Sequence, residues 1–207
     1  MLGPHEQILE AARAAIEQYG PDALTSQIAE RAGLARPNVY RYFDSKDALD
    51  LAVAHTAYRE LRAEVRARLD LCGTPHEVIR APIAAHITWA DSHPNLYRFL
   101  GSHGSRRTSQ LRNAERHDFG TEILEAGRRY FPRFTENPDA ASAIVIGIAG
   151  LLDASILSWL NLRTETREHL IDRLTKQAWL IVDHHLREIG VCLDPAVKFP
   201  QSGQTLG

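Results

Sequence analysis

Cysteine, methionine and tryptophan are scarce in this chain of 207 residues, which holds two cysteines, one methionine and three tryptophans. Cys72 and Cys192 lie far apart and form neither a CxxC pair nor the framework of a disulfide-rich domain. A chain without such a framework needs a hydrophobic core, and a hydrophobic content of 44% can supply one. We therefore predict a globular protein of a reducing compartment, the cytoplasm.

Long apolar runs and a basic leader are also missing. The first residues, MLGPHEQILEAARAA, show no basic start followed by an apolar core, so no signal peptide is predicted. The longest apolar run, Ala143 to Leu152, is shorter than the roughly 18 residues that span a bilayer, and Asp153 follows it. We therefore predict no membrane partner.

Positive charge is not in excess. The formal net charge is −2, and five cations face eight acidic residues within residues 1–50. A protein that coats nucleic acid without sequence preference is therefore not expected. A local basic cluster remains, because Arg36, Arg41 and Lys46 lie within eleven positions, and phosphate contacts need only one basic face.

Metal-ligand and catalytic patterns are absent despite ten histidines. His184 and His185 are adjacent and point to different faces of a helix, while His86 and His93 straddle a proline break. No histidine pair has i, i+4 ligand spacing with a carboxylate or cysteine beside it. The order of serines, histidines and aspartates supports no catalytic arrangement. We predict no metal, no cofactor and no enzymatic activity.

Helical periodicity is the main positive signal. Apolar residues recur at spacings of three and four, and glycines and prolines fall between these periodic segments. We predict an all-α fold of about nine helices without strand hairpins, followed by a disordered tail over residues 196–207. The predicted helices cover about residues 4–19, 25–32, 37–43, 45–71, 75–92, 94–102, 108–131, 138–162 and 166–190.

One stretch, TSQIAERAGLARPNVYRYFDSK from Thr25 to Lys46, combines two short helices with a glycine turn and the start of a third helix. Thr25 suits an N-cap, Gly33 suits the turn, and Pro37 suits the first turn of the second helix. This order is typical of a helix-turn-helix, whose second helix enters the DNA major groove.

Three segments of this region resemble the TetR family of bacterial transcriptional regulators: IAERAG (28–33), VYRYFDSKDAL (39–49), and the preceding helix ending in Tyr19-Gly20. The resemblance implies a DNA-binding head (residues 1–48) and a ligand-binding and dimerisation body (residues 49–195). It implies a regulator, most often a repressor, that a small molecule releases from a palindromic operator. The alternative is a helical small-molecule binding protein or enzyme without specific DNA binding.

Several head residues have the chemistry of DNA contacts. Arg36 could reach guanine edges, and Asn38 adenine or a phosphate. Lys46 opposes the dipole of the helix that it opens, which a bound phosphate would neutralise. A purely structural or surface role is the alternative for Thr25, Arg36, Tyr40 and Arg41, and Phe43 is predicted to be core. The predicted DNA-binding residues are Thr25, Arg36, Pro37, Asn38, Tyr40, Arg41, Tyr42 and Lys46.

In the body, the resemblance implies a pocket for a partly apolar effector of unknown identity. Core packing is the alternative for each aromatic candidate. Asp153 interrupts an apolar helix, and a buried carboxylate needs a partner, which is a ligand, an internal cation or a second subunit. The predicted ligand-binding residues, which together give mostly apolar walls with a few polar groups, are His86, Trp89, Tyr97, His117, Phe119, Tyr130, Asp153 and Trp159.

Residues 138–162 and 166–190 are too apolar for the outer layer of a monomer, which predicts a homodimer. Small residues allow close helix approach, and two-fold dimers read palindromes. The alternative is that residues 138–162 are simply the core of the body. The predicted interface residues are Gly147, Gly150, Ala154, Leu174, Ala178, Ile181 and His185.

Overall fold

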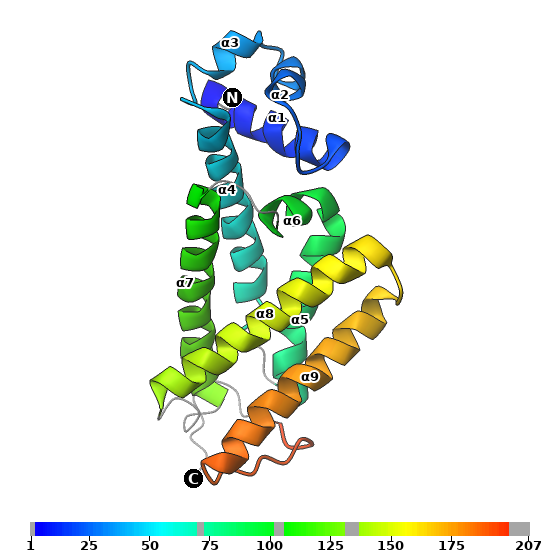
Figure 1. Cartoon of the computed structure of the whole chain (residues 1–207). Coiled ribbons are helices and arrows are strands. Elements are labelled where there is room, and N and C mark those ends of the chain that lie inside the picture. The colour runs from blue at the N-terminus through cyan, green and yellow to red at the C-terminus, as the bar shows by residue number, and fades with distance from the viewer. Residues whose placement is uncertain (1–2, 70–72, 102–105, 131–136, 199–207) are drawn as a thin grey trace. The chain divides into compact units, whose positions relative to one another are not determined.

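The protein is all-helical over the residues that the computed structural model describes, which are 3–69, 73–101, 106–130 and 137–198. These residues form nine α-helices and no strand, which confirms the predicted fold class. In chain order (Figure 1) the helices are α1 (Pro4–Tyr19), α2 (Thr25–Arg31), α3 (Arg36–Val39), α4 (Lys46–Arg66), α5 (Pro75–Ser92), α6 (Pro94–Gly101), α7 (Arg106–Tyr130), α8 (Pro138–Leu162) and α9 (Arg167–Glu188).

α3 and α4 end several residues before their predicted ends. α3 stops at Val39 and continues as a tight turn, in which the N–H of Tyr42 donates to the carbonyl of Val39. α4 stops at Arg66, and the N–H of Leu69 donates to the Arg66 carbonyl. These i, i+3 bonds are typical of a last turn that tightens. Apolar spacing alone does not separate such a turn from an α-helix. Of the predicted tail, residues 199–207 lie outside the described residues.

The chain divides into two compact units. The first comprises residues 1–60 and 90–115, and the second comprises residues 61–89 and 116–207. The division therefore runs within α4, α5 and α7, whereas the sequence interpretation places a boundary after residue 48. That boundary separates predicted functions, and it stays a prediction.

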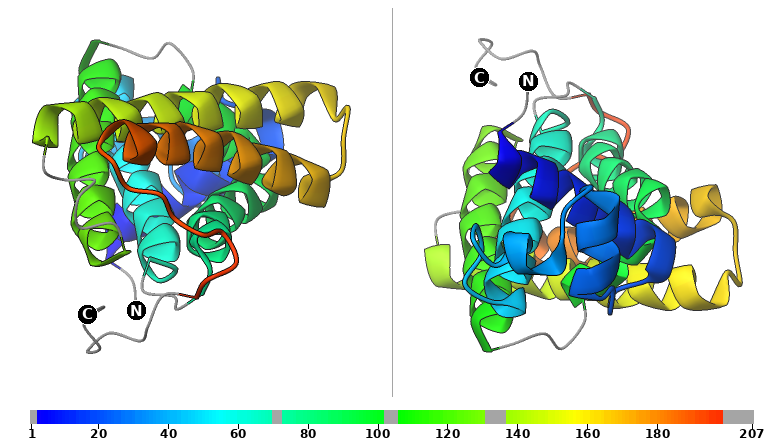
Figure 2. Two further views of the ribbon diagram at one scale, coloured as in Figure 1. Left: turned by 90° about the horizontal axis from the view of Figure 1, so that it is seen from below. Right: turned by 90° about the horizontal axis from the view of Figure 1, so that it is seen from above.

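In the first unit, α1 packs against α2 and α6 (Figure 2). Its apolar stripe is fully buried at Ile8, Ala12 and Ile16. The Glu17 carboxylate accepts a hydrogen bond of 2.8 Å from the N–H of Leu96, near the start of α6. An acidic group at this position satisfies helix N–H groups that have no partner within the helix. This contact explains why α6 belongs to the first unit.

The turn between α2 and α3 depends on Gly33, whose φ is +67°. The N–H of Gly33 donates to the Glu30 carbonyl, and the N–H of Leu34 donates to the Ala29 carbonyl. These two bonds form a Schellman motif, in which the residue after the C-cap adopts a left-handed conformation. Glycine adopts this conformation without the steric cost that a Cβ atom brings.

Substituting Gly33 by alanine should lower the free energy of unfolding by about 1–2 kcal/mol, because a Cβ atom disfavours the left-handed region. A Cβ atom there would meet no other atom within 4 Å, so the cost is conformational rather than steric. Urea unfolding followed by circular dichroism measures it. Gly127→Ala is the matched control, since Gly127 lies inside α7, has no positive φ and has open space at its Cβ position. Equal stability of both variants would contradict this explanation of the turn.

In the second unit, α8 and α9 run side by side in opposite directions (Figures 1 and 2). Their contact includes a buried cluster of four residues. Each helix begins with a side-chain cap: Asn137 accepts from the N–H of Ala140, and Thr166 accepts from the N–H of His169. The cluster consists of Ala141, Val145, Val182 and Leu186.

α8 is unusually apolar for a helix with so little cover. From Asp139 to Leu162 it is long and apolar enough to cross a membrane by length and composition, although only 17% of its most apolar window is buried. The prediction that no segment reaches this length therefore fails for α8. The same property characterises a core helix or a helix that another protein chain covers.

Candidate DNA-binding surface and apolar cavity

The chain segment from Arg36 to Lys46, which begins with α3 and is called the α3 segment, presents one polar face to solvent. Val39 and Phe43 are only 1% and 5% exposed, and they anchor the segment to the first unit. The Phe43 ring stacks on His5 with a centroid distance of 4.6 Å, so the prediction that Phe43 is core is confirmed. The predicted DNA contacts that lie exposed are Arg36, Pro37, Tyr40, Arg41 and Tyr42, and those that lie half-buried are Asn38 and Lys46.

Thr25 does not have the capping role predicted for it. The N-cap of α2 is Leu24, whose N–H donates to the Gln27 side chain at 2.7 Å. Thr25 is the first residue of α2 and is 7% exposed, and its hydroxyl accepts from the Tyr40 hydroxyl at 3.4 Å. The prediction was wrong by one position, because threonine is a preferred N-cap and leucine is not. Thr25 instead ties α2 to the segment that follows α3.

Tyr40 keeps its ring at the surface, with 38% of the residue exposed, so it does not pack inward beside Phe43. The pKa of its phenol is lowered, chiefly by the hydrogen bond to Thr25 and then by the neighbouring Arg36. Tyr40 and Arg36 therefore lie together on the exposed side, where a phenol hydroxyl and a guanidinium are both suitable donors to an anionic backbone.

Lys46 has a partner that the sequence interpretation missed. Its Nζ lies 2.5 Å from Oδ1 of Asp50, one turn further along α4. Burial raises the pKa of the Asp50 carboxyl, although the hydrogen bond from Lys46 opposes that shift. The i, i+4 spacing of the two residues was visible in the sequence. A phosphate that binds Lys46 therefore has to compete with Asp50.

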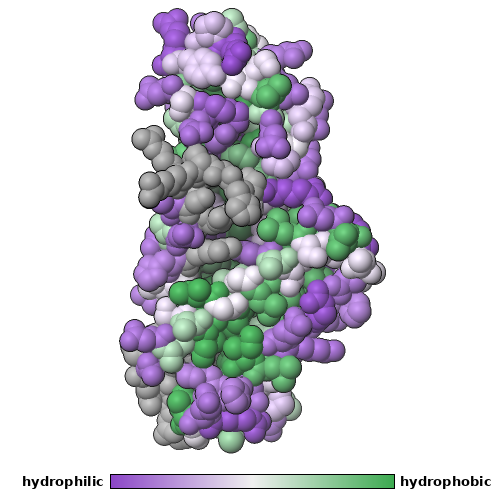
Figure 3. Space-filling view, in the orientation of Figure 1, coloured by the Kyte–Doolittle hydropathy of each residue, from purple (hydrophilic) through white to green (hydrophobic). Residues whose placement is uncertain are grey.

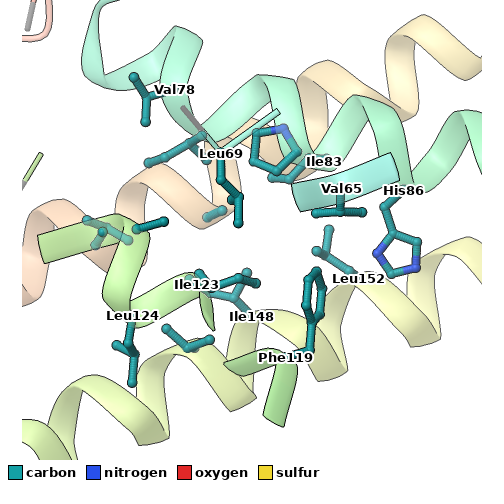
Figure 4. A pocket seen from close by; sticks show the side chains of 17 residues that line it. Val65, Leu69, Val78, Ile83, His86, Phe119, Ile123, Leu124, Ile148 and Leu152 are labelled. Atoms are coloured by element: carbon teal, nitrogen blue, oxygen red, sulfur yellow. The ribbon is translucent and has the colours of Figure 1, made fainter. Parts of the chain in front are cut away.

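The second unit contains a cavity with a volume of about 150 Å³, formed by α5, α7, α8, α9 and the end of α4 (Figure 4). Its lining is apolar apart from one side chain, His86. The 17 lining residues are Val65, Leu69, Val78, Ile79, Pro82, Ile83, His86, Phe119, Ile123, Leu124, Ala126, Gly127, Val145, Ile148, Leu152, Ala178 and Val182.

His86 is 8% exposed, and its Nε2 lies 3.9 Å from Oδ1 of Asp153 on α8. Burial lowers the pKa of His86, and the negative charge of Asp153 only partly opposes this effect. The imidazole is therefore neutral at pH 7. Of the partners considered for Asp153, the structure supplies an internal one, which is a histidine rather than a permanent cation.

The cavity brings together two of the eight predicted ligand-binding residues, His86 and Phe119. Trp89 and Trp159 are buried elsewhere, and the Trp159 indole donates to the Glu165 carbonyl at 2.8 Å. Among the other predicted residues, Tyr97 is buried in the first unit, His117 is exposed, Asp153 touches His86 without lining the cavity, and the side chain of Tyr130 lies outside the described residues.

The predicted interface residues separate into two groups. Leu174 and Ala178 are 0% and 1% exposed, so they belong to the core of the second unit and their interface assignment is wrong. The His185 side chain is also largely buried, with 12% exposed. Four remaining residues are exposed, and two large apolar residues that the sequence interpretation missed, Ile146 and Leu180, are exposed with them.

These six exposed residues define the α8–α9 face. Ile146 and Leu180 are 47% and 65% exposed, which is unusual for side chains of this size. Figure 3 shows a hydrophobic band along α8 and α9 on the side of the molecule in view. The α8–α9 face consists of Ile146, Gly147, Gly150, Ala154, Leu180 and Ile181.

No group of three or more His, Cys, Asp or Glu residues is arranged to hold a metal ion in the described part of the chain. The described histidines with carboxylate neighbours include His169 beside Glu165 and His184 beside Glu188, at 3.5 and 3.7 Å. Each is an i, i+4 contact on the exposed side of α9 or just before it, which is an ordinary surface pair.

Comparisons with known proteins agree on one family. Residues 8–53 match the family model described as "Bacterial regulatory proteins, tetR family". The HTH-type transcriptional regulator BetI of Brucella canis is 36% identical over 85 residues, which cover 41% of this chain and 43% of that protein. An uncharacterised HTH-type transcriptional regulator of Mycobacterium tuberculosis is 32% identical over 92 residues, which cover 44% of this chain and 46% of the relative.

Solved structures share the fold over most of the chain. A tetR-family transcriptional regulator from Streptomyces coelicolor superposes with a TM-score of 0.76 at 23% identity, covering 91% of this chain and 87% of that one. The fatty acid degradation regulator FadR from Bacillus halodurans gives a TM-score of 0.69 at 19% identity, covering 86% and 96%. At these identities the likeness establishes the fold.

The fold and the α2–turn–α3 region define an all-helical protein with an N-terminal helix-turn-helix domain. Residues 8–53 match the tetR family of bacterial regulatory proteins, and most of the chain shares its fold with solved tetR-family structures. It spans less than half the length of the curated relatives named above. The family model matches the helix-turn-helix region. The cavity and the α8–α9 face both lie outside that match.

Proposed function

We propose that this protein is a sequence-specific, DNA-binding transcriptional regulator that responds to a small molecule and acts in the bacterial cytoplasm, most often as a repressor. One observation carries the proposal. The exposed side of the α3 segment displays Arg36, Tyr40 and Tyr42, and buried Val39 and Phe43 hold that segment in place. This segment lies within the region that matches the family model.

The polar face of the α3 segment suits two kinds of DNA contact. Arg36 stands at the first residue of α3 and is the best candidate for bidentate contact with guanine. Tyr40, Tyr42, Arg41 and Lys46 suit the phosphate backbone, which positions the protein without specifying sequence. Thr25 is a weaker candidate than the sequence indicates, because its side chain is buried against Tyr40.

A homodimer on a palindromic operator follows from the size of this surface. One short helix reads few base pairs, and helix-turn-helix dimers place two such helices about 34–36 Å apart or at a multiple of that spacing. The α8–α9 face supplies the surface for the second copy, because its exposed apolar side chains gain stability when they are covered.

The cavity supports response to a small molecule. α4 begins at Lys46, in the helix-turn-helix region, and Val65 on the same helix lines the cavity. A ligand that favours one position of the last turns of α4 shifts the population of α4 orientations. The distance between the α3 helices of the two copies then ceases to match successive major grooves.

Selection of bound DNA from random oligonucleotides at low salt tests the proposed function. We expect enrichment of a palindrome with half-sites one helical turn apart or a multiple of it. Failure to enrich any sequence would overturn the proposal. It would favour instead a helical small-molecule binding protein, the reading that the cavity supports on its own.

Replacing Lys46 by alanine should weaken binding to all DNA sequences and lower the slope of log affinity against log salt by about one unit per bound copy. Asp50→Asn should act in the opposite direction, since it releases Lys46 from its 2.5 Å contact. Fluorescence anisotropy over a series of salt concentrations measures both slopes. Lys176→Ala, which removes the same charge from the exposed side of α9, is the matched control. If the slope for Lys46→Ala equals that of the control, Lys46 pairs with Asp50 only and does not contact a DNA phosphate.

A further inference from the structure

The lining of the cavity in the second unit favours uncharged ligands over ions. No Lys, Arg, Asp or Glu occurs among the residues that line it in the described part of the chain, and His86 is its single titratable side chain. Moving an ion from water into such surroundings without a partner is strongly unfavourable, and a bound acid or amine would instead be forced into its neutral form.

The polar end of the cavity has no charged side chain that could pair with a bound ion. His86 lies at one end of the labelled side chains in Figure 4. Its Nε2 lies 3.9 Å from Oδ1 of Asp153. The imidazole is buried and neutral, so it offers no positive charge to a carboxylate. Asp153 does not line the cavity, so it is not placed to pair with an ammonium group there.

The volume limits the size of the ligand. A cavity of about 150 Å³ with aliphatic and phenylalanine walls has the size of the apolar cavities that stay dry and admit benzene. A ligand of about eight non-hydrogen atoms fills a space on this scale. Several of these walls are β-branched, at Ile79, Ile83 and Ile148, and such side chains have few rotamers through which they could make room for a larger one.

From these observations we infer that the cavity binds an uncharged, mainly apolar molecule of the size of a single six-membered ring, whose one polar group lies at His86. The inference rests on the proposed function for its biological meaning, since it names the class of effector. The binding chemistry itself depends only on the lining of the cavity.

Three probes of similar size and different charge test the inference: benzyl alcohol, benzoate and benzylammonium, each titrated into the full chain at pH 7 by calorimetry. We expect benzyl alcohol to bind at least tenfold more tightly than either ion. Equal or tighter binding of an ion overturns the inference, and so does the absence of binding by all three at millimolar concentration. A neutral probe of twice the size, 9-anthracenemethanol, should bind at least tenfold more weakly than benzyl alcohol.

Two variants locate the binding. Gly127 lines the cavity, and a Cβ atom there would meet no atom within 4 Å, so Gly127→Leu places a new side chain at the cavity wall. This variant should bind benzyl alcohol at least fivefold more weakly. His86→Leu should weaken the binding of benzyl alcohol about three- to tenfold, as the loss of one hydrogen bond predicts. The affinity for toluene, which has no polar group, should change less than twofold. His169→Leu, at an exposed histidine on α9, is the matched control and should change neither affinity.

Operator affinity in the presence of the same probes separates the two proposals. Binding of benzyl alcohol without any change in operator affinity upholds the ligand class and contradicts the proposed ligand response. Selection of a palindrome together with preferential binding of benzoate upholds the regulator and overturns the ligand class. Unchanged benzyl alcohol affinity in Gly127→Leu also overturns the inference, because it places the binding outside the cavity.

Discussion

Replacing Gly147 by arginine on α8 should abolish homodimerisation and lower operator affinity at least a hundredfold. Gly147 is exposed on the α8–α9 face, and a Cβ atom there would meet no other atom of the same chain within 4 Å. The isolated chain should therefore keep its fold. At a helix–helix interface the guanidinium would be buried without a partner. A single head then binds without the 10²- to 10⁴-fold gain that a linked second head gives.

Analytical ultracentrifugation measures the oligomeric state of Gly147→Arg, and fluorescence anisotropy measures its affinity for the selected operator. Thr121→Arg is the matched control, because it adds the same side chain at an exposed position on α7. The control should remain dimeric with unchanged operator affinity. A dimeric Gly147→Arg variant that binds the operator normally would move the interface away from the α8–α9 face.

A second copy explains the α8–α9 face better than a bilayer does. α8 has the length and composition of a membrane-spanning helix, and it leaves Ile146 47% exposed. Asp153, however, lies near the middle of α8 and contacts His86 of the same chain. A carboxylate near the centre of a bilayer costs about 2.5–3.5 kcal/mol on insertion scales. A protein partner that covers only the exposed side of α8 leaves the contact between Asp153 and His86 in place.

Most of the helical architecture could be predicted from the sequence because its boundaries are chemically marked. α1, α5 and α8 begin with Pro4, Pro75 and Pro138, and their predicted first and last residues match the structure. Such boundaries depend on local backbone chemistry, which a single sequence records. Thr25 shows the limit of this reasoning, since the favoured cap residue lies one position inside the helix that it was expected to cap.

Most of the lining of the cavity could not be predicted, because its walls are made of ordinary aliphatic residues. Val65, Ile123 and Ile148 line it, and nothing in their local sequence distinguishes them from core residues such as Ile156. The sequence interpretation favoured polar and aromatic residues, which stand out in an apolar helix. A cavity is a gap between elements that are distant in sequence, so its position depends on packing that spacing does not encode.

The dimer interface was partly misassigned for a related reason. Leu174, Ala178, Ile181 and His185 recur on α9 at spacings of three and four, which places them on one side of the helix. The structure turns most of that side inward, and Ala178 lines the cavity. Periodicity identifies an apolar stripe but not the chain that covers it. Only Ile181, at the edge of the stripe and 38% exposed, remains available to a second copy.

Leu174→Ala should therefore destabilise the single chain rather than the dimer, and the free energy of unfolding should fall by about 2–5 kcal/mol. Leu174 is 0% exposed, and truncation of a buried leucine loses transfer energy and leaves a cavity. The substitution is best made in the Gly147→Arg background, because dimerisation adds to apparent stability by mass action. Urea unfolding at constant protein concentration then reports the second unit alone if the two units unfold separately, and the whole chain if they unfold together.

Ile181→Ala provides the contrast on the same helix. In the monomeric background it should cost about 1 kcal/mol or less, because much of its side chain is already in water. In the wild-type background it should weaken the dimer, which sedimentation equilibrium measures. A loss of less than about 1 kcal/mol for Leu174→Ala, or equal losses for the two monomeric variants, would contradict the division of α9 into a core side and an interface edge. Under the proposed function, that division lets one helix close the cavity and also carry the second copy.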